Sequence, residues 1–259
     1  MSEAKGKKHD LSKEKKIAEY VLNAKFFTRR SINVEAMART FRPLWRTKLN
    51  FEVSMAGDNV VLIAFEWEVD AEKVIQGEPW VFNRNLVVLQ RYDGTTPINE
   101  LGFDRITFWV QIHNLPFSFM TKEAAISLGE TIGIVSKPKD EAEMRGQFMR
   151  VRVVVDVTKP LCRGRTITWD QGRDRWVYYL YKQLPNLCYW CGFLSHDDKE
   201  CVVWLSSKES LSKEEQQFGP WLQAPQFNLA RKAIVEVQGF ESPGMNRNLP
   251  SRIEEHTSD

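Results

Sequence analysis

Four residues between positions 188 and 201 have the types and the spacing that bind a zinc ion. The segment reads C-x2-C-x4-H-x4-C, which supplies three thiols and one imidazole. Zinc favours such a set in a tetrahedron, and a four-ligand pattern is far more specific than one C-x2-C pair. We therefore predict one structural zinc ion. Its ligands are Cys188, Cys191, His196 and Cys201.

The composition of this ligand set also limits the chemistry of the metal. Four protein ligands leave no open position for a water molecule, so hydrolysis by this ion is not expected. Gly192 follows the second cysteine and suits a tight turn, because glycine accepts a positive φ without a Cβ penalty. Two other interpretations are a chance grouping of Cys and His and a redox C-x2-C pair. The redox interpretation leaves His196 and Cys201 unexplained.

Three aromatic residues stand within the predicted knuckle, namely Tyr189, Trp190 and Phe193. Small zinc knuckles that bind single strands use flat side chains of this kind to stack on bases. The alternative is that the rings form a miniature core over the metal. A unit this small cannot bury three large rings, which favours stacking by at least one of them.

Within the knuckle, Asp197, Asp198 and Glu200 outnumber the lysines. Affinity for phosphate must therefore come from other parts of the chain. A basic stretch at 150–175 leads into the knuckle through a predicted hairpin and is the better candidate for a nucleic-acid track. The arginines that we predict to contact nucleic acid there are Arg163, Arg165, Arg173 and Arg175. A second basic stripe lies on the first predicted helix, although such a charged face is more often only solvated.

The whole chain has the features of an intracellular protein. It has 259 residues, 42% of them hydrophobic, and a formal net charge of +2, which is too small to imply a polyanion partner by itself. Three of its four cysteines lie in the knuckle, so a disulfide framework is not expected. No apolar run approaches the roughly 18 residues of a membrane span. The lysine-rich start lacks a secretory signal, and we expect the nucleus or cytoplasm, not secretion.

Two α+β modules are predicted to position the knuckle. Residues 18–94 follow the order strand, helix, strand, strand, helix, strand, which is the split βαβ plan of ferredoxin-like folds, RNA-recognition motifs included. The first helix is expected to begin at a Ser31 cap and to bury an apolar stripe. That stripe comprises Val34, Met37, Phe41, Leu44 and Trp45. Residues 103–184 form a second, smaller α+β module that ends in a hairpin.

The remaining segments are the knuckle at 185–204, a disordered basic arm at 1–17 and a largely disordered tail at 205–259. The apolar stretch FGPWLQA is an exception in the tail and is a candidate for docking. Because each module has an apolar core of its own, we expect the metal to stabilise the knuckle alone.

Several segments together resemble a family of plant proteins related to the first open reading frame of LINE-type, non-LTR retrotransposons. In that family a domain of unknown function is fused to a CCHC zinc knuckle. The segments are LWR, GEPWVFN, FWVQIHNLP, VRVVVDVTKPL, YKQLPNLCYWCGFLSHDDKEC and FGPWLQA, and they extend over residues 18–225. The resemblance implies zinc and nucleic-acid binding by an RNA-chaperone-like or particle-forming protein.

The chain departs from this family and from RNA-recognition motifs at a few positions. Ser195 stands where such knuckles often carry a second glycine. Val60, Leu62 and Gln111 stand where stacking aromatics are expected. We therefore predict that the sheets are scaffolds and do not read bases.

The sequence favours a non-catalytic protein that binds single-stranded RNA or DNA through zinc. It contains no Ser-His-Asp or P-loop pattern and no polymerase or endonuclease constellation, so an enzyme is not expected. Self-association or a protein partner stays open. The alternative function is a protein-interaction scaffold whose knuckle is purely structural, in which Tyr189, Trp190 and Phe193 would be buried.

Overall fold

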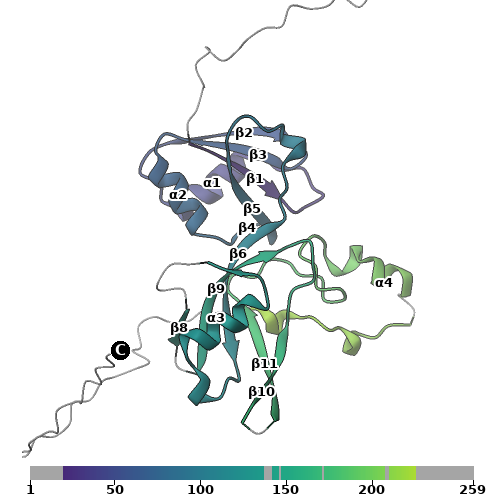
Figure 1. Ribbon diagram of the computed structural model, residues 1–259. Helices are drawn as coiled ribbons and strands as arrows, with labels where there is room; N and C mark the ends of the chain where they lie inside the picture. The colour runs from purple at the N-terminus through teal and green to yellow at the C-terminus, as the bar shows by residue number, and fades with distance from the viewer. Residues whose placement is uncertain (1–19, 137–141, 146, 171, 208–209, 226–259) are drawn as a thin grey trace, which may run out of the picture. The chain divides into compact units, whose positions relative to one another are not determined.

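The computed structural model describes residues 20–136, 142–145, 147–170, 172–207 and 210–225, which all fall in one compact unit. They form two antiparallel sheets with a few short helices, a mixed α+β fold (Figure 1). The predicted basic arm at 1–17 lies outside the described residues, and the first strand begins at Tyr20. No helix in the described part of the chain is long and apolar enough to cross a membrane.

The first sheet has the strand order β2-β3-β1-β5-β4 in the described residues. Its strands are β1 Tyr20–Phe26, β2 Phe51–Gly57, β3 Val60–Phe65, β4 Trp80–Phe82 and β5 Asn85–Tyr92, and its helices are α1 Val34–Trp45 and α2 Glu68–Gln76. The central strand β1 is antiparallel to both β3 and β5. The crossover through α1 passes over β3, and the crossover through α2 passes over β1 and β5 to reach β4. The element order matches that predicted for residues 18–94, with the short β4 added at the edge.

Helix α1 begins two residues later than predicted. Its N-cap is Asn33, whose side chain accepts a hydrogen bond from the N–H of Ala36 at 2.8 Å, so the prediction of a Ser31 cap was wrong. The helix packs an aromatic stripe into the first core, and the Phe41 and Trp45 rings stack with centroids 4.8 Å apart. Leu44, predicted in the same stripe, is 53% exposed. The buried members of the stripe are Met37, Phe41 and Trp45.

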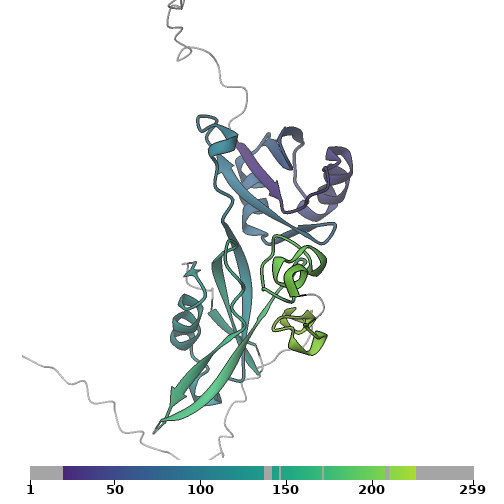
Figure 2. The same cartoon turned by 90° about the vertical axis from the view of Figure 1, so that its right-hand side faces the viewer.

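The second sheet has the order β10-β11-β6-β9-β7, and β8 pairs with β9. Its strands are β6 Arg105–His113, β7 Ile134–Val135, β8 Ala142–Arg145, β9 Phe148–Asp156, β10 Gly164–Trp169 and β11 Arg173–Tyr181. Helix α3, Lys122–Glu130, contacts β9, and β10 and β11 pair as a long, twisted hairpin (Figure 2). Strand β7 is short, and residues 137–140 that follow it lie outside the described residues.

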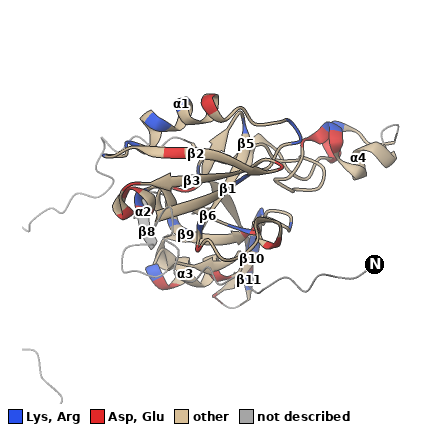
Figure 3. Ribbon diagram, turned by 90° about the horizontal axis from the view of Figure 1, so that it is seen from above, with Lys and Arg blue, Asp and Glu red and all other residues tan. Residues whose placement is uncertain are grey.

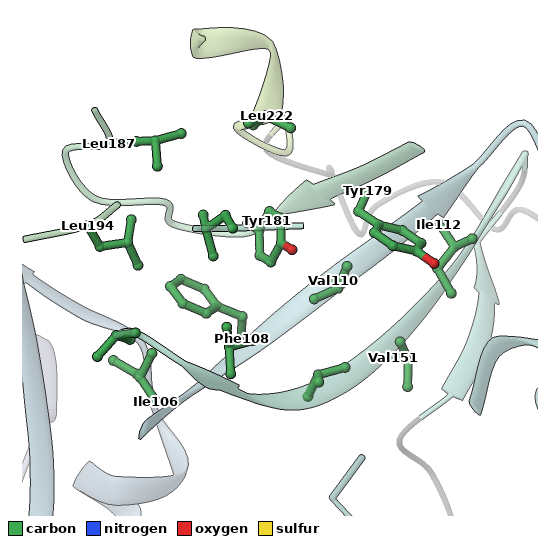
Figure 4. Close-up of a cluster of buried hydrophobic side chains, with 14 of the residues drawn as sticks. Ile106, Phe108, Val110, Ile112, Val151, Tyr179, Tyr181, Leu187, Leu194 and Leu222 are labelled. Atoms are coloured by element: carbon green, nitrogen blue, oxygen red, sulfur yellow. The ribbon is translucent and has the colours of Figure 1, made fainter. Parts of the chain in front are cut away.

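The core of the second sheet continues into the chain that follows β11. Strand residues such as Phe108 and Tyr181 share one buried cluster with Leu187 and Leu194 of the knuckle segment and with Leu222 (Figure 4). The Phe108 and Tyr181 rings meet edge to face with centroids 5.6 Å apart. Side chains on both sides of the metal loop thus contribute to the module's own core, whereas a core separate from the knuckle was expected.

A short stretch after the knuckle returns to the same sheet. It comprises α4 Val202–Ser207 and the 3-10 turns Lys213–Glu215 and Pro220–Leu222. The N–H of Ala224 donates to the carbonyl of Tyr181 at 2.9 Å, and Leu222 is buried. The apolar segment FGPWLQA therefore docks beside β11. This part of the predicted tail has defined structure, and residues from 226 onward lie outside the described residues.

The two sheets meet at a buried carboxyl group. Leu86 and Val88 of β5 belong to the buried cluster of the second sheet, which we call the second core. The N–H of Thr107 on β6 donates to Oε2 of Glu78 at 3.3 Å. Burial raises the pKa of Glu78 to about 7, despite the opposing effect of that hydrogen bond and of Arg152. The folded chain therefore keeps this carboxyl protonated at pH values at which an exposed glutamate is ionised.

Candidate metal centre and its surroundings

The four predicted ligands converge on one point. The ligand atoms of Cys188, Cys191, His196 and Cys201 all lie within 4.8 Å of one another. The Cys191 Sγ and the His196 Nε2 are 3.2 Å apart. A zinc tetrahedron with Zn–S distances of about 2.3 Å has edges of roughly 3.8 Å, so a small contraction places all four around one ion. The donor set and the spacing both fit zinc.

Backbone hydrogen bonds shape the loop that carries the first two cysteines. The N–H of Gly192 donates to the carbonyl of Cys188 at 2.8 Å, and the N–H of Cys188 donates to the carbonyl of Phe193 at 2.9 Å. Gly192 has a φ of 79°, in the left-handed region predicted for it. The N–H of Leu161 donates to the Gly192 carbonyl at 2.9 Å and ties the loop to the segment before β10.

A second layer of contacts orients the histidine. The Ser195 hydroxyl lies 3.1 Å from Nδ1 of His196, which leaves Nε2 facing the cysteines. Ligating histidines usually bind a partner through the other ring nitrogen, and that partner fixes the tautomer and the ring orientation. In this chain the Ser195 hydroxyl stands in the place of such a partner.

The three thiols differ in acidity because their surroundings differ. Burial raises the pKa of Cys188 and of Cys191. Burial also acts on Cys201, but hydrogen bonds from the Trp204 N–H and the His196 ring outweigh it and lower the pKa of Cys201 to about 7. Zinc binds thiolates, so its binding releases protons from the two more basic thiols.

The three aromatic residues of the knuckle contact the protein itself. Tyr189 packs against the second core, and its N–H donates to Oδ1 of Asp198 at 2.5 Å. The Trp190 ring stacks on Trp204, with centroids 4.9 Å apart and planes 12° from parallel. Phe193 lies beside His196, with ring centroids 6.4 Å apart. All three rings are half-buried, so each has part of its surface occupied by neighbours.

The four predicted arginines do not share one set of contacts. Arg163 donates to the carbonyl of Gln217 at 2.8 Å, and its guanidinium lies 5.3 Å from the centre of the Phe218 ring. Arg165 instead donates to the carbonyl of Thr131 at the end of α3, at 3.0 Å. Arg175 lies over the Trp169 ring at 4.9 Å, and Arg173 is exposed. Basic and acidic residues are interspersed over the described chain (Figure 3).

Sequence reasoning missed three exposed aromatic residues near Arg163, namely Trp176, Tyr178 and Trp221. The alternation in RWVYYLYK contained the signal for two of them, because a strand that buries Val177 and Tyr179 turns Trp176 and Tyr178 to the other face. Trp221 gives no such signal, since its place depends on how the segment after the knuckle docks.

Two segments of the chain match known protein families. Residues 18–99 match the family described as Domain of unknown function (DUF4283), and residues 155–203 match the family described as Zinc knuckle. A protein of Arabidopsis thaliana described as uncharacterized is 24% identical over 135 residues, which cover 51% of this chain and 42% of that protein. The matched region thus spans less than half of that relative. These matches confirm the two parts of the predicted resemblance, a domain of unknown function and a zinc knuckle.

Proposed function

We propose that this protein is a non-catalytic, zinc-dependent binder of single-stranded RNA or DNA. The observation that carries the proposal is the convergence of four zinc-type ligands inside a segment similar to zinc knuckles. Knuckles of this kind commonly bind unstacked bases in single strands. A closed four-ligand site leaves the metal a structural role, which supports the absence of catalysis by this ion.

The proposed role of zinc is to hold the loop that supports the neighbouring surface. A bound ion would draw Cys188 and Cys201 together from the two ends of the knuckle. The loop between them contacts Phe218, because the N–H of Phe218 donates to the carbonyl of Tyr189 at 3.1 Å. The guanidinium of Arg163 lies over the Phe218 ring and would be offered to a phosphate. Metal binding and nucleic-acid contact are therefore expected to be coupled.

We also infer a ferredoxin-like fold for the first sheet and an origin in a plant LINE-type retrotransposon or its domesticated relic. The fold is supported by β1 lying between two antiparallel neighbours and by the two crossing helices. The origin is supported by the ordered set of resembling segments from LWR to FGPWLQA. An intracellular location accords with free thiols that bind metal.

One observation favours the second candidate function, a protein-interaction scaffold. Tyr189 packs into the core and Trp190 stacks on Trp204, so two of the three knuckle rings already have partners within the chain. A purely structural knuckle would use them in this way. The distinction depends on whether zinc removal changes nucleic-acid affinity or only affinity for another protein.

The test is a titration of fluorescein-labelled single-stranded oligonucleotides with the zinc-loaded chain, followed by fluorescence anisotropy. The same measurement is made on the Cys191→Ser variant and on a duplex of the same sequence. We expect the zinc-loaded chain to bind the single strand more tightly than the duplex, and the variant to lose most of that affinity. Equal binding by the variant would favour the scaffold, and no binding by the zinc-loaded chain would refute the proposal.

A further inference from the structure

A solvent-open hollow of about 560 Å³ lies between β11 and the segment at 220–222 that follows the knuckle. It is lined by Arg163, Trp176, Tyr178, Tyr179, Leu180, Trp221 and Leu222, and we call it the aromatic groove. Trp176 is 48% exposed, Tyr178 is 42% exposed and Trp221 is 58% exposed. Large aromatic side chains gathered at one open site mark an interaction surface more often than chance exposure does.

Each tryptophan of the aromatic groove lies directly against a glycine. A Cβ built on Gly164 would stand 2.7 Å from the Trp176 indole, and one built on Gly219 would stand 2.1 Å from the Trp221 indole. Both rings therefore use the space that a side chain at these glycines would fill. Contact with the backbone on one side holds each indole in place while the other side stays accessible to a ligand.

Tyr178 is held by stacking within the sheet. Its ring lies parallel to that of His113, with centroids 5.2 Å apart, and His113 in turn stacks on the buried Phe148 at 4.8 Å. The phenol of Tyr178 is thus the exposed end of a row of rings that crosses β11, β6 and β9. Rings fixed in this way lose little conformational freedom when a flat ligand stacks on them.

The charge of the aromatic groove selects the class of ligand. Its lining includes the guanidinium of Arg163 and contains no carboxylate. The flat rings fit a planar ligand group, and the guanidinium fits a negative charge next to that group. A nucleotide of a single strand has both features, because its base stacks on aromatic faces and its phosphate pairs with arginine.

We propose that the aromatic groove binds an unstacked nucleotide of single-stranded nucleic acid, with Tyr178 and Trp221 stacking on the base and Arg163 contacting the phosphate. The proposal rests on the proposed function and assigns its base contacts to this groove instead of the three rings of the knuckle. It thereby gives β11 a base contact, whereas both sheets were predicted to be scaffolds. Zinc supports the groove indirectly. Arg163 donates to the Gln217 carbonyl, and the next residue, Phe218, packs on the metal loop at Gly192.

The experiment uses the full zinc-loaded chain and a fluorescein-labelled single-stranded oligo(dT). Trp221→Ala and Tyr178→Ala should each weaken binding roughly five- to 150-fold at an unchanged dependence on salt, the signature of lost stacking. Trp221→Phe should retain most of the affinity. The matched control is Phe117→Ala, since Phe117 is 80% exposed and lies outside the groove. Zinc content and thermal melting of each variant show that it folds.

A second measurement locates the contact directly. An oligonucleotide with 4-thiouridine is crosslinked to the wild-type chain, and the modified peptides are identified by mass spectrometry. We expect crosslinks at Tyr178 or Trp221. Crosslinks confined to residues 189–193, or groove variants with wild-type affinity, would overturn the groove proposal and leave the proposed function standing. If a protein segment occupies the groove instead, the groove variants should likewise bind the oligonucleotide with wild-type affinity. Failure of the wild-type chain to bind refutes both proposals.

Discussion

Phe218 covers Gly192 so closely that a methyl group on Gly192 would lie 2.3 Å from Cζ of the Phe218 ring. The described chain between the two residues contains α4 and the 3-10 turns Asp198–Glu200 and Lys213–Glu215. Their contact joins the metal loop to the stretch that carries Trp221. The zinc loop and the aromatic groove are therefore parts of one packed unit.

Gly192→Ala should destabilise the zinc-loaded chain by about 1–3 kcal/mol, because alanine is strained at a positive φ and its methyl group would displace Phe218. The matched control is Gly172→Ala, since Gly172 has a similar φ of 84° but open space around it. Urea unfolding of both variants measures the difference. If the two substitutions cost the same, the Phe218 contact contributes nothing.

Ser195→Ala should weaken zinc affinity by roughly tenfold, since partners of ligating histidines typically contribute that much or more. The Ser195 hydroxyl contacts His196 Nδ1, and its loss frees the ring to turn or to change tautomer. Competition with a chromophoric chelator gives the affinity. Ser206→Ala is the control, because Ser206 bonds only to the backbone of α4. An affinity equal to that of wild type would show that Ser195 does not orient the ligand.

Zinc removal should destabilise the second sheet as well as the knuckle. Leu187 precedes the first ligand, Leu194 lies between the second and the third, and both pack in the same core as Tyr181. A released loop therefore withdraws apolar side chains from that core. Hydrogen exchange of the chelated chain should rise along β11 and β6 and change little in β1 and β3. Faster exchange limited to residues 185–204 would show that the knuckle folds independently.

Stability should also depend on the charge of Glu78. Its pKa is raised to about 7 in the folded chain, above that of the unfolded chain, so its favourable contribution is complete below the unfolded pKa. That contribution is lost as the pH rises through about 7. Glu78→Gln stays neutral, so the variant should become more stable relative to wild type between pH 5 and pH 8, by on the order of 1–3 kcal/mol.

Urea unfolding of both proteins at the two pH values isolates this effect, because protonation of the zinc ligands changes wild type and variant alike. Thr107 stays available to donate to the glutamine side-chain oxygen. A difference between wild type and variant that does not change with pH would contradict the account of the buried carboxyl.

The sequence predicted those features that short-range patterns determine. The C-x2-C-x4-H-x4-C spacing identified four side chains that the fold brings together. The apolar periodicity located most strands and helices of both sheets and missed the short strands β4 and β8. The cap of α1 was misplaced because Ser31 and Asn33 are both good capping residues, and only the exit of the chain from β1 decides between them.

Features that depend on tertiary docking could not be read in this way. Burial of Leu187 and Leu194 in the second core, and the seat of Phe218 on Gly192, depend on where the chain goes after the knuckle. For the same reason Tyr189 and Trp190 were assigned to base stacking, whereas the fold gives both of them contacts within the chain.

The central claim, that zinc holds a surface for single-stranded nucleic acid, is tested most directly by returning zinc to the metal-free chain. Oligonucleotide affinity and bound zinc are measured in the same titration. The account predicts that affinity rises with each addition and stops rising when one zinc per chain has bound. A metal-free chain that binds the oligonucleotide as tightly as the zinc-loaded chain would contradict it.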